Sequence, residues 1–146
     1  MKPLLVIGLG NPLMGDEGIG WHVAERLAGD ARLPAGVEVV CGGTDLLRHA
    51  DRMEERRRVI VVDALRDDAE LGSVRAFDAP AGLDNRQDNA HCLSAVQAIQ
   101  LLRMTIPVPI TLLGISIPCA NTQTGLSPEL TARMAAILER VLRELG

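Results

Sequence analysis

Short apolar segments alternate with helix-like segments along the chain, and this alternation constrains the fold more than any other feature. A continuous apolar run, as in residues 4–9, is typical of a strand that is covered on both faces. Strands are expected at residues 4–9, 37–41, 59–62, 73–77 and 110–117, and helices at 19–28, 90–104 and from 128 onward, with a short helix after 44 or 45. Ser127 is the expected cap of the last helix, because it stands directly before Pro128 at the first helical position. The pattern predicts an α/β fold with a largely parallel sheet and helices on both faces. No repeat or linker divides the 146 residues, so one domain is expected over 1–146.

Right-handed crossovers would gather the loops after the strands along one edge of this sheet. Ligands of such sheets bind at the carboxyl ends of the strands. Glu17, Asp63 and the loops after the second and fifth strands all belong to that edge. We therefore expect the functional site there.

Charge and composition exclude several classes of partner. The net charge is −4, from 15 basic and 19 acidic residues, so no basic stripe for nucleic acid is expected. Trp21 and Phe77 are the only aromatic residues, which leaves no set of rings for stacking bases. The longest apolar run is far shorter than a membrane span, and no leader-like segment opens the chain. Three unpaired cysteines fit a reducing compartment, so a cytoplasmic protein without nucleic-acid or membrane partners is predicted.

The glycine-rich segment 8–20 follows the first strand and invites comparison with dinucleotide-binding loops. Its glycines do not have the G-x-G-x-x-G spacing. Asp16 and Glu17 also stand where a pyrophosphate needs neutral or positive surroundings. A dinucleotide site is therefore disfavoured.

Two carboxylates and one imidazole from three loops could together bind a divalent metal. Glu17 lies in the glycine-rich segment, Asp63 follows the third strand, and His91 falls in the first turn of a helix capped by Asn89. Imidazole with carboxylate suits zinc, nickel or iron, and ligand chemistry does not choose among them. Each residue also has a purely structural interpretation. Asp16 and Glu17 would interact favourably with the dipole of the following helix, Asp63 would form a turn, and His91 would be a surface or capping residue.

Other catalytic arrangements fare worse. The chain has no H-E-x-x-H, P-loop or G-x-S-x-G motif. Cys92 adjoins His91, but helix neighbours point about 100° apart and do not form a nucleophile–base pair. Cys119 is interpreted as a small buried residue, and His22 and His49 as structural residues.

The sequence resembles the hydrogenase maturation endopeptidases along its whole length. The resemblance is carried by Gly-Asn-Pro-Leu-Met-Gly-Asp-Glu-Gly-Ile-Gly at 10–20, Gly-Gly-Thr at 42–44 with Leu46-Leu47, Val62-Asp63, and His91. It implies a twisted five-stranded sheet with helices on both sides. It also implies an endopeptidase that trims a C-terminal extension from the large-subunit precursor of a nickel–iron hydrogenase after nickel insertion.

The same resemblance assigns roles to residues. Glu17, Asp63 and His91 would contact nickel that the precursor already holds, so nickel need not be a permanent cofactor. Asp16 would support or orient this cluster. The partner that the resemblance implies is the hydrogenase large-subunit precursor, and a monomer or weak oligomer is expected.

Two departures from the family pattern concern the loop expected to face the substrate. Family members often have an aspartate just before Gly-Gly-Thr, where this chain has Cys41. The stretch from Thr44 to Leu47 is also short, and Asp45 is a possible replacement for the missing carboxylate.

Two alternatives remain open. Gly8-Leu-Gly-Asn-Pro is similar to the opening of bacterial peptidyl-tRNA hydrolases, although Asp16, Glu17 and the acidic charge oppose RNA binding. A nickel-binding assembly factor without peptidase activity could use the same ligands, and loss of a precursor tail would distinguish the two.

Overall fold

The computed structural model describes residues 2–78, 93–118 and 124–146. Its strands are β1 (Leu4–Leu9), β2 (Val37–Gly43), β3 (Arg58–Leu65), β4 (Val74–Phe77) and β5 (Ile110–Ser116). Its helices are α1 (Ile19–Ala28), α2 (Ala50–Met53), α3 (Leu93–Thr105), α4 (Pro128–Thr131) and α5 (Met134–Leu145), with 3₁₀ turns η1 (Gly15–Gly18) and η2 (Leu46–His49). Most expected elements are confirmed, and the expected start of α3 lies outside the described residues.

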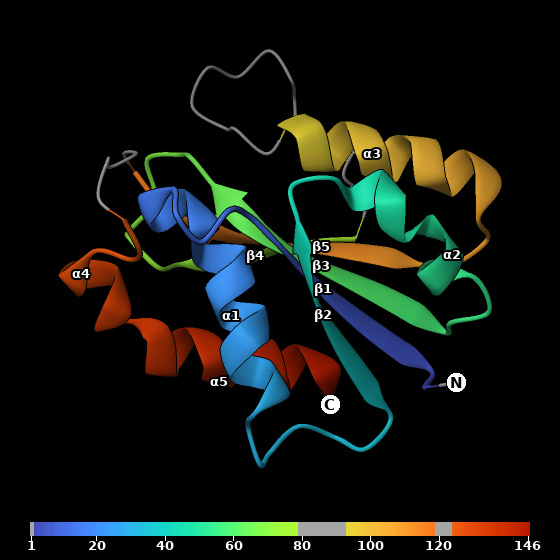
Figure 1. Ribbon diagram of the computed structural model, residues 1–146, viewed down its shortest axis with the longest axis horizontal. Coiled ribbons are helices and arrows are strands. Elements are labelled where there is room, and N and C mark those ends of the chain that lie inside the picture. The colour runs from blue at the N-terminus through green and yellow to red at the C-terminus, as the bar shows by residue number, and fades with distance from the viewer. Residues whose placement is uncertain (1, 79–92, 119–123) are drawn as a thin grey trace.

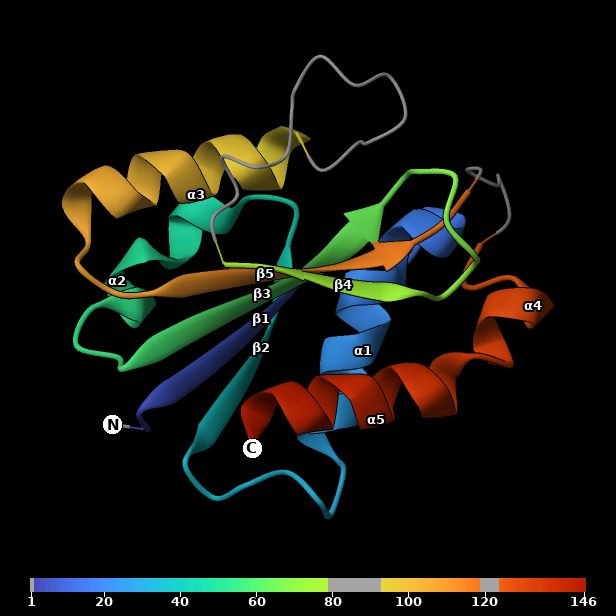
Figure 2. The ribbon, with the colours of Figure 1, turned by 180° about the vertical axis from the view of Figure 1, so that it is seen from behind.

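Within the described residues, the strands form one sheet in the order β2-β1-β3-β5-β4. The first four of these strands pair in parallel, and β4 runs antiparallel to β5 at the edge. Figures 1 and 2 show α2 and α3 on one face of the sheet and α1 and α5 on the other. The predicted three-layer α/β fold with a mostly parallel five-stranded sheet is confirmed.

Alternate residues of the central strands build two hydrophobic cores. Val59 and Val61 of β3 pack toward α3, whereas Ile60 and Val62 pack toward α1 and α5. All four are completely buried, as the two-residue period of a strand between two helical layers requires. Both faces of β3 are therefore covered by apolar packing, and polar functional side chains can lie only toward its carboxyl end.

The last helical segment differs from the expected single helix. α4 ends at Thr131 and α5 begins at Met134. The Arg133 N–H donates to the carbonyl of Leu130, three residues back, where a continuous α-helix would use the residue four back. This tighter turn separates α4 from α5, whose apolar side chains pack in the core against the sheet.

No helix in the described part of the chain is long and apolar enough to cross a membrane.

Candidate functional site

In this strand order the carboxyl ends of β1 and β3 form a topological switch point, the place where α/β folds have a ligand crevice. From β1 the chain continues to β2 on one side, whereas from β3 it continues to β4 and β5 on the other side. The connections therefore diverge at the carboxyl ends of β1 and β3, and α/β sheets bind ligands at such a switch point. Both predicted carboxylates, Glu17 after β1 and Asp63 in β3, belong to these two strand ends.

The glycines of the first loop serve close packing. A Cβ on Gly20 would lie 2.2 Å from the carbonyl oxygen of Leu9 and 2.4 Å from that of Val62. A Cβ on Gly8 would lie 2.1 Å from the carbonyl oxygen of Gly20. Gly10 has φ +136° and approaches the backbone of η1, a conformation that side chains rarely adopt. The beginning of α1 is thus pressed onto the ends of β1 and β3, so the glycine pattern needs no nucleotide to explain it.

Asp16 and Glu17, neighbours on η1, face different surroundings. Asp16 is buried, and its two carboxylate oxygens accept hydrogen bonds from the backbone N–H and hydroxyl of Ser127, at 2.7 and 2.8 Å. Ser127 in turn caps α4, because its hydroxyl accepts from the N–H of Leu130 at 3.2 Å. Asp16 therefore ties η1 to α4, and its role toward the metal-contacting residues stays a prediction. The sequence identified Ser127 as a helix cap and missed its bond to Asp16.

Asp63 lies inside β3, two residues before its end. The pairing of β1 with β3 stops at Val62, whereas β5 continues to pair with β3 through Leu65. The expectation that the strand ends at Val62 is therefore wrong, because β5 supports the extra residues. From Asp63 onward β3 has no pairing with β1, so Asp63 lies at the switch point.

The surroundings of Asp63 disfavour its charge. Burial raises the pKa of Asp63 from 3.8 to about 7, against the opposing effect of the Ala64 N–H, which donates to Oδ1 at 2.8 Å. The nearby Glu17 carboxylate contributes a further increase of the pKa. The structure thus brings two carboxylates of the prediction close enough to interact.

Glu17 has a cationic neighbour that sequence analysis did not single out. Arg66 follows β3 directly, and its guanidinium Nη1 lies 3.8 Å from Oε1 of Glu17. About two fifths of each side chain is exposed, 41% for Arg66 and 38% for Glu17. Arg66 is not part of any motif in the sequence, so only the fold could reveal this pair.

The third predicted ligand, His91, lies outside the described residues, as do Cys92 and Cys119. Among residues 2–78, 93–118 and 124–146, no group of three or more His, Cys, Asp or Glu side chains forms a metal-binding cluster. Of the predicted ligand set, Glu17 and Asp63 lie within the described residues and supply two oxygen donors.

The second strand is longer than expected. Cys41 lies in β2, as the strand expected at 37–41 requires, but β2 continues through Gly43 and so includes both glycines of Gly-Gly-Thr. The Cys41 thiol donates to the carbonyl of Trp21 at 3.8 Å. Burial raises the pKa of the Cys41 thiol, and Glu25 adds to the increase, so the thiol does not replace a carboxylate. Asp45 is exposed and accepts the Leu47 N–H at 3.2 Å as the cap of η2. His49 contacts the carbonyl of Gly42 at 2.9 Å, which supports its structural interpretation.

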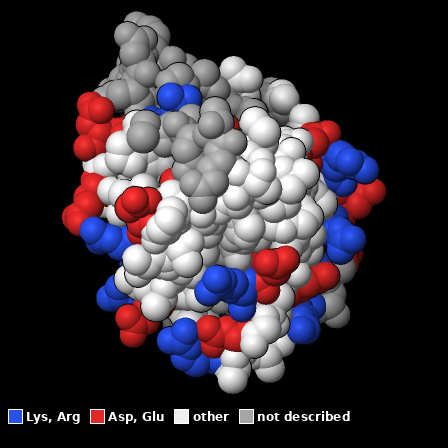
Figure 3. Space-filling view, turned by 60° about the vertical axis from the view of Figure 1, so that its left-hand side comes forward, with Lys and Arg blue, Asp and Glu red and all other residues white. Residues whose placement is uncertain are grey.

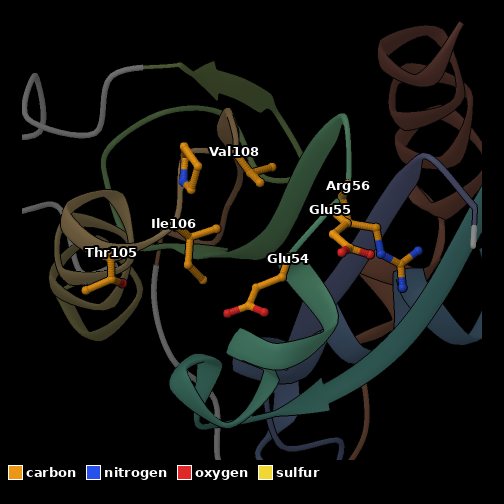
Figure 4. A pocket seen from close by; sticks show the side chains of 7 residues that line it. Glu54, Glu55, Arg56, Thr105, Ile106 and Val108 are labelled. Atoms are coloured by element: carbon orange, nitrogen blue, oxygen red, sulfur yellow. The ribbon is translucent and has the colours of Figure 1, made fainter.

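A separate pocket of about 410 Å³ opens at the opposite end of the sheet. Figure 4 shows it between the turn that precedes β3 and the segment that joins α3 to β5. Glu54 and Glu55 lie at this pocket with the apolar side chains of Ile106 and Val108. It is remote from the carboxyl ends of β1 and β3 and shares no residue with the crevice.

Charged side chains are mixed on the face shown in Figure 3. Lysine and arginine alternate with aspartate and glutamate around an uncharged central area. The described residues of this face therefore form no continuous basic stripe.

Comparisons with known proteins identify the family and agree with the fold. Residues 21–144 match the hydrogenase maturation protease family. Hydrogenase 2 maturation protease of Escherichia coli (strain K12) is 31% identical over 148 residues, with 97% of this chain and 90% of the relative covered. The δ subunit of coenzyme F420 hydrogenase from Methanothermobacter thermautotrophicus is 28% identical, with 98% and 94% covered.

Solved structures extend this agreement to the whole fold. The hydrogenase maturating endopeptidase HybD from E. coli superimposes with a TM-score of 0.77 at 31% identity, covering 100% of this chain and 94% of HybD. HybD from Thermococcus kodakarensis gives the same TM-score at 24% identity with 100% of both chains covered, and so supports the fold. The matched span and the identity over nearly the full length show that the chain belongs to the hydrogenase maturation protease family.

Proposed function

We propose that this protease removes the C-terminal extension from the large-subunit precursor of a nickel–iron hydrogenase, and that it does so after nickel insertion by recognising nickel held in the precursor. The observation that carries the proposal is the meeting of Glu17 and Asp63 at the switch-point crevice of a maturation-protease fold. Cleavage of the peptide follows from the family, and the nickel requirement is the finer part of the proposal.

The donor chemistry fits nickel presented by a substrate. Glu17 is partly exposed and can reach an incoming metal, and Asp63 lies beside the crevice where β1 ends. Carboxylate oxygens with one imidazole, for which His91 is the proposed source, are ligands that nickel accepts. A bound dication also favours ionised Asp63, because an adjacent positive charge lowers a carboxyl pKa.

The chain's own residues then place the precursor for hydrolysis. Glu17 and Asp63 would hold the metal face of the precursor against the crevice, and Asp16 would keep η1 in position through Ser127. Nickel in the precursor would supply Lewis-acid chemistry at the scissile carbonyl or at a water molecule. No serine or cysteine nucleophile is required.

The test is cleavage of nickel-loaded precursor, followed by mass spectrometry of the released tail. Glu17→Gln and His91→Ala should each reduce cleavage by at least about tenfold, the effect typical of lost metal contacts. Glu139→Gln changes an exposed glutamate on α5 and is the matched control. Full activity in both site variants would refute the proposed ligands.

Two further outcomes separate the alternatives. Equal cleavage of nickel-free and nickel-loaded precursor would refute the nickel requirement while leaving the peptidase intact. Stable nickel carriage without any loss of the tail would instead support a metal carrier. The expected monomer or weak oligomer stays a prediction, which light scattering can measure.

A further inference from the structure

Arg66 places a fixed positive charge beside the proposed metal-contacting carboxylate. Its Nη1 lies 3.8 Å from Oε1 of Glu17, and both side chains are partly exposed. Arginine stays charged at every pH in which the protein is folded. Any cation that approaches Glu17 in the free protein therefore meets this guanidinium.

The carboxylate next to Arg66 in the sequence, that of Asp67, has other partners. Asp67, the next residue, is buried and pairs with Arg75 at 2.9 Å, and it also accepts the N–H of Ala69. Arg66 is thus directed to Glu17 although an aspartate adjoins it in the sequence. This arrangement leaves Asp67 out of the crevice and gives Glu17 a counter-ion.

We propose that Arg66 acts as a selectivity residue, which occupies Glu17 in the free protease, discourages binding of free divalent metal, and moves aside when the precursor docks. This inference rests on the proposed function, because it explains how a site for substrate-borne nickel avoids free nickel. Arg66 is a positioning and specificity residue and takes no part in bond cleavage.

The geometry suits displacement. A separation of 3.8 Å is too long for a hydrogen bond, so the pair is a charge contact without a fixed fork geometry. Exposed ion pairs contribute little to stability, and the long arginine side chain can turn into solvent at little cost. The contact is close enough to repel a cation and weak enough to break when a protein surface docks.

The same charge discriminates between two forms of nickel. Free Ni²⁺ carries its full double charge into the field of Arg66. Nickel in a precursor is bound by deprotonated protein ligands, which offset part of that charge. Repulsion from Arg66 therefore falls mainly on the free ion, and the precursor complex gains additional contacts that can displace the side chain.

The first test is calorimetric titration of untagged, metal-free protein with nickel chloride. Arg66→Gln removes the charge and should tighten Ni²⁺ binding by about three- to tenfold, as expected for one unit charge near a surface site. Arg66→Lys keeps the charge and should bind Ni²⁺ as the wild type does. Arg133→Gln is the matched control, because Arg133 is also about half exposed, at 50%, but pairs with Glu70 and not with Glu17.

A double variant ties the effect to the crevice. In Glu17→Gln/Arg66→Gln the gain in affinity should disappear, since the released carboxylate is then missing. Unchanged Ni²⁺ affinity in Arg66→Gln, or an equal gain in Arg66→Lys, would overturn the proposal.

Processing supplies the second readout. Free Ni²⁺ should inhibit cleavage of nickel-loaded precursor at about three- to tenfold lower concentration in Arg66→Gln than in the wild type, because the free ion now competes for Glu17. Identical inhibition in both proteins would contradict the inference. If neither the wild type nor the Arg66→Gln variant cleaves the precursor, the proposed function fails, whereas the calorimetry still decides the role of Arg66.

Discussion

Replacing Asp63 by asparagine should stabilise the protein while it removes a proposed nickel contact. The folded state raises the pKa of Asp63 from 3.8 to about 7, chiefly through burial. Asparagine has nearly the same shape and its side-chain oxygen can still accept the Ala64 N–H. It therefore keeps the local hydrogen bond without requiring an ionised group in the crevice.

The sign follows from proton binding. Between about pH 4 and about pH 7 the folded protein binds more protons at Asp63 than the unfolded chain does, so stability falls as the pH rises through this window. Stability present at low pH is lost as Asp63 ionises. The amide that replaces this carboxyl does not titrate, so the Asp63→Asn protein should escape this loss.

The magnitude is set by the difference between the two pKa values. A change from 3.8 to about 7 corresponds to about 4 kcal/mol at about pH 8 and to less than about 2 kcal/mol at about pH 5. These are upper values, because the amide also loses water on burial. We expect Asp63→Asn to be more stable than the wild type at about pH 8, and its stability advantage to narrow by about 2.5 kcal/mol toward about pH 5.

Urea unfolding of metal-free protein at several pH values measures this directly. The single tryptophan, Trp21 on α1, supplies a fluorescence signal, and circular dichroism at helical wavelengths checks that both probes agree. The same variant should lose most processing of nickel-loaded precursor. An Asp63→Asn protein that is no more stable at about pH 8, or whose advantage stays constant with pH, contradicts the assigned surroundings of Asp63.

Three further substitutions test contacts of the site and of the rest of the fold. Gly20→Ala should destabilise the fold by at least about 3 kcal/mol in urea unfolding, because its Cβ meets backbone oxygens at 2.2 and 2.4 Å, whereas Gly29→Ala, with a nearest contact of 3.9 Å, should change stability far less. Ser127→Ala should lower the free energy of unfolding by about 1–2 kcal/mol and weaken processing, since it removes both a helix cap and a donor to a buried carboxylate. Glu38→Gln should destabilise the protein at neutral pH, because its hydrogen bond to the guanidinium of buried Arg56 lowers the pKa of Glu38. That stability is lost as the pH falls through the lowered pKa, so the difference between wild type and Glu38→Gln should vanish in acid, and a difference that grows in acid would contradict the pairing.

Local patterns in the sequence predict most of the fold because each strand and helix carries its own signal. The apolar run of β1 and the bounds of α1 agree with expectation at both ends. Ser127 was identified as the cap of the last helical segment from its place before Pro128, and the structure confirms it. These features depend on residues that are neighbours in the chain, so the local sequence is enough to predict them.

Features that depend on distant partners were harder to predict. The extension of β3 beyond Val62 comes from pairing with β5, and the antiparallel direction of β4 comes from its own edge pairing with β5. The Glu17–Arg66 pair likewise joins residues from two loops that only the sheet brings together. In each case the deciding contact joins residues far apart in the sequence, and the hydrophobic periodicity of the sequence does not predict such a contact.

The glycine-rich loop shows why a motif should be interpreted together with what it packs against. In a nucleotide-binding protein, glycines allow the backbone to approach a phosphate. Here Gly8 and Gly20 allow one backbone segment to approach another, since Cβ atoms at these positions would lie 2.1–2.4 Å from carbonyl oxygens of α1, β1 and β3. That contact fixes η1 at the sheet edge, and η1 carries Glu17 to the end of β3, where Asp63 lies. The loop therefore contributes to the site by bringing the carboxylates of Glu17 and Asp63 together. Two adjacent carboxylates favour a cation, rather than a phosphate, as the ligand.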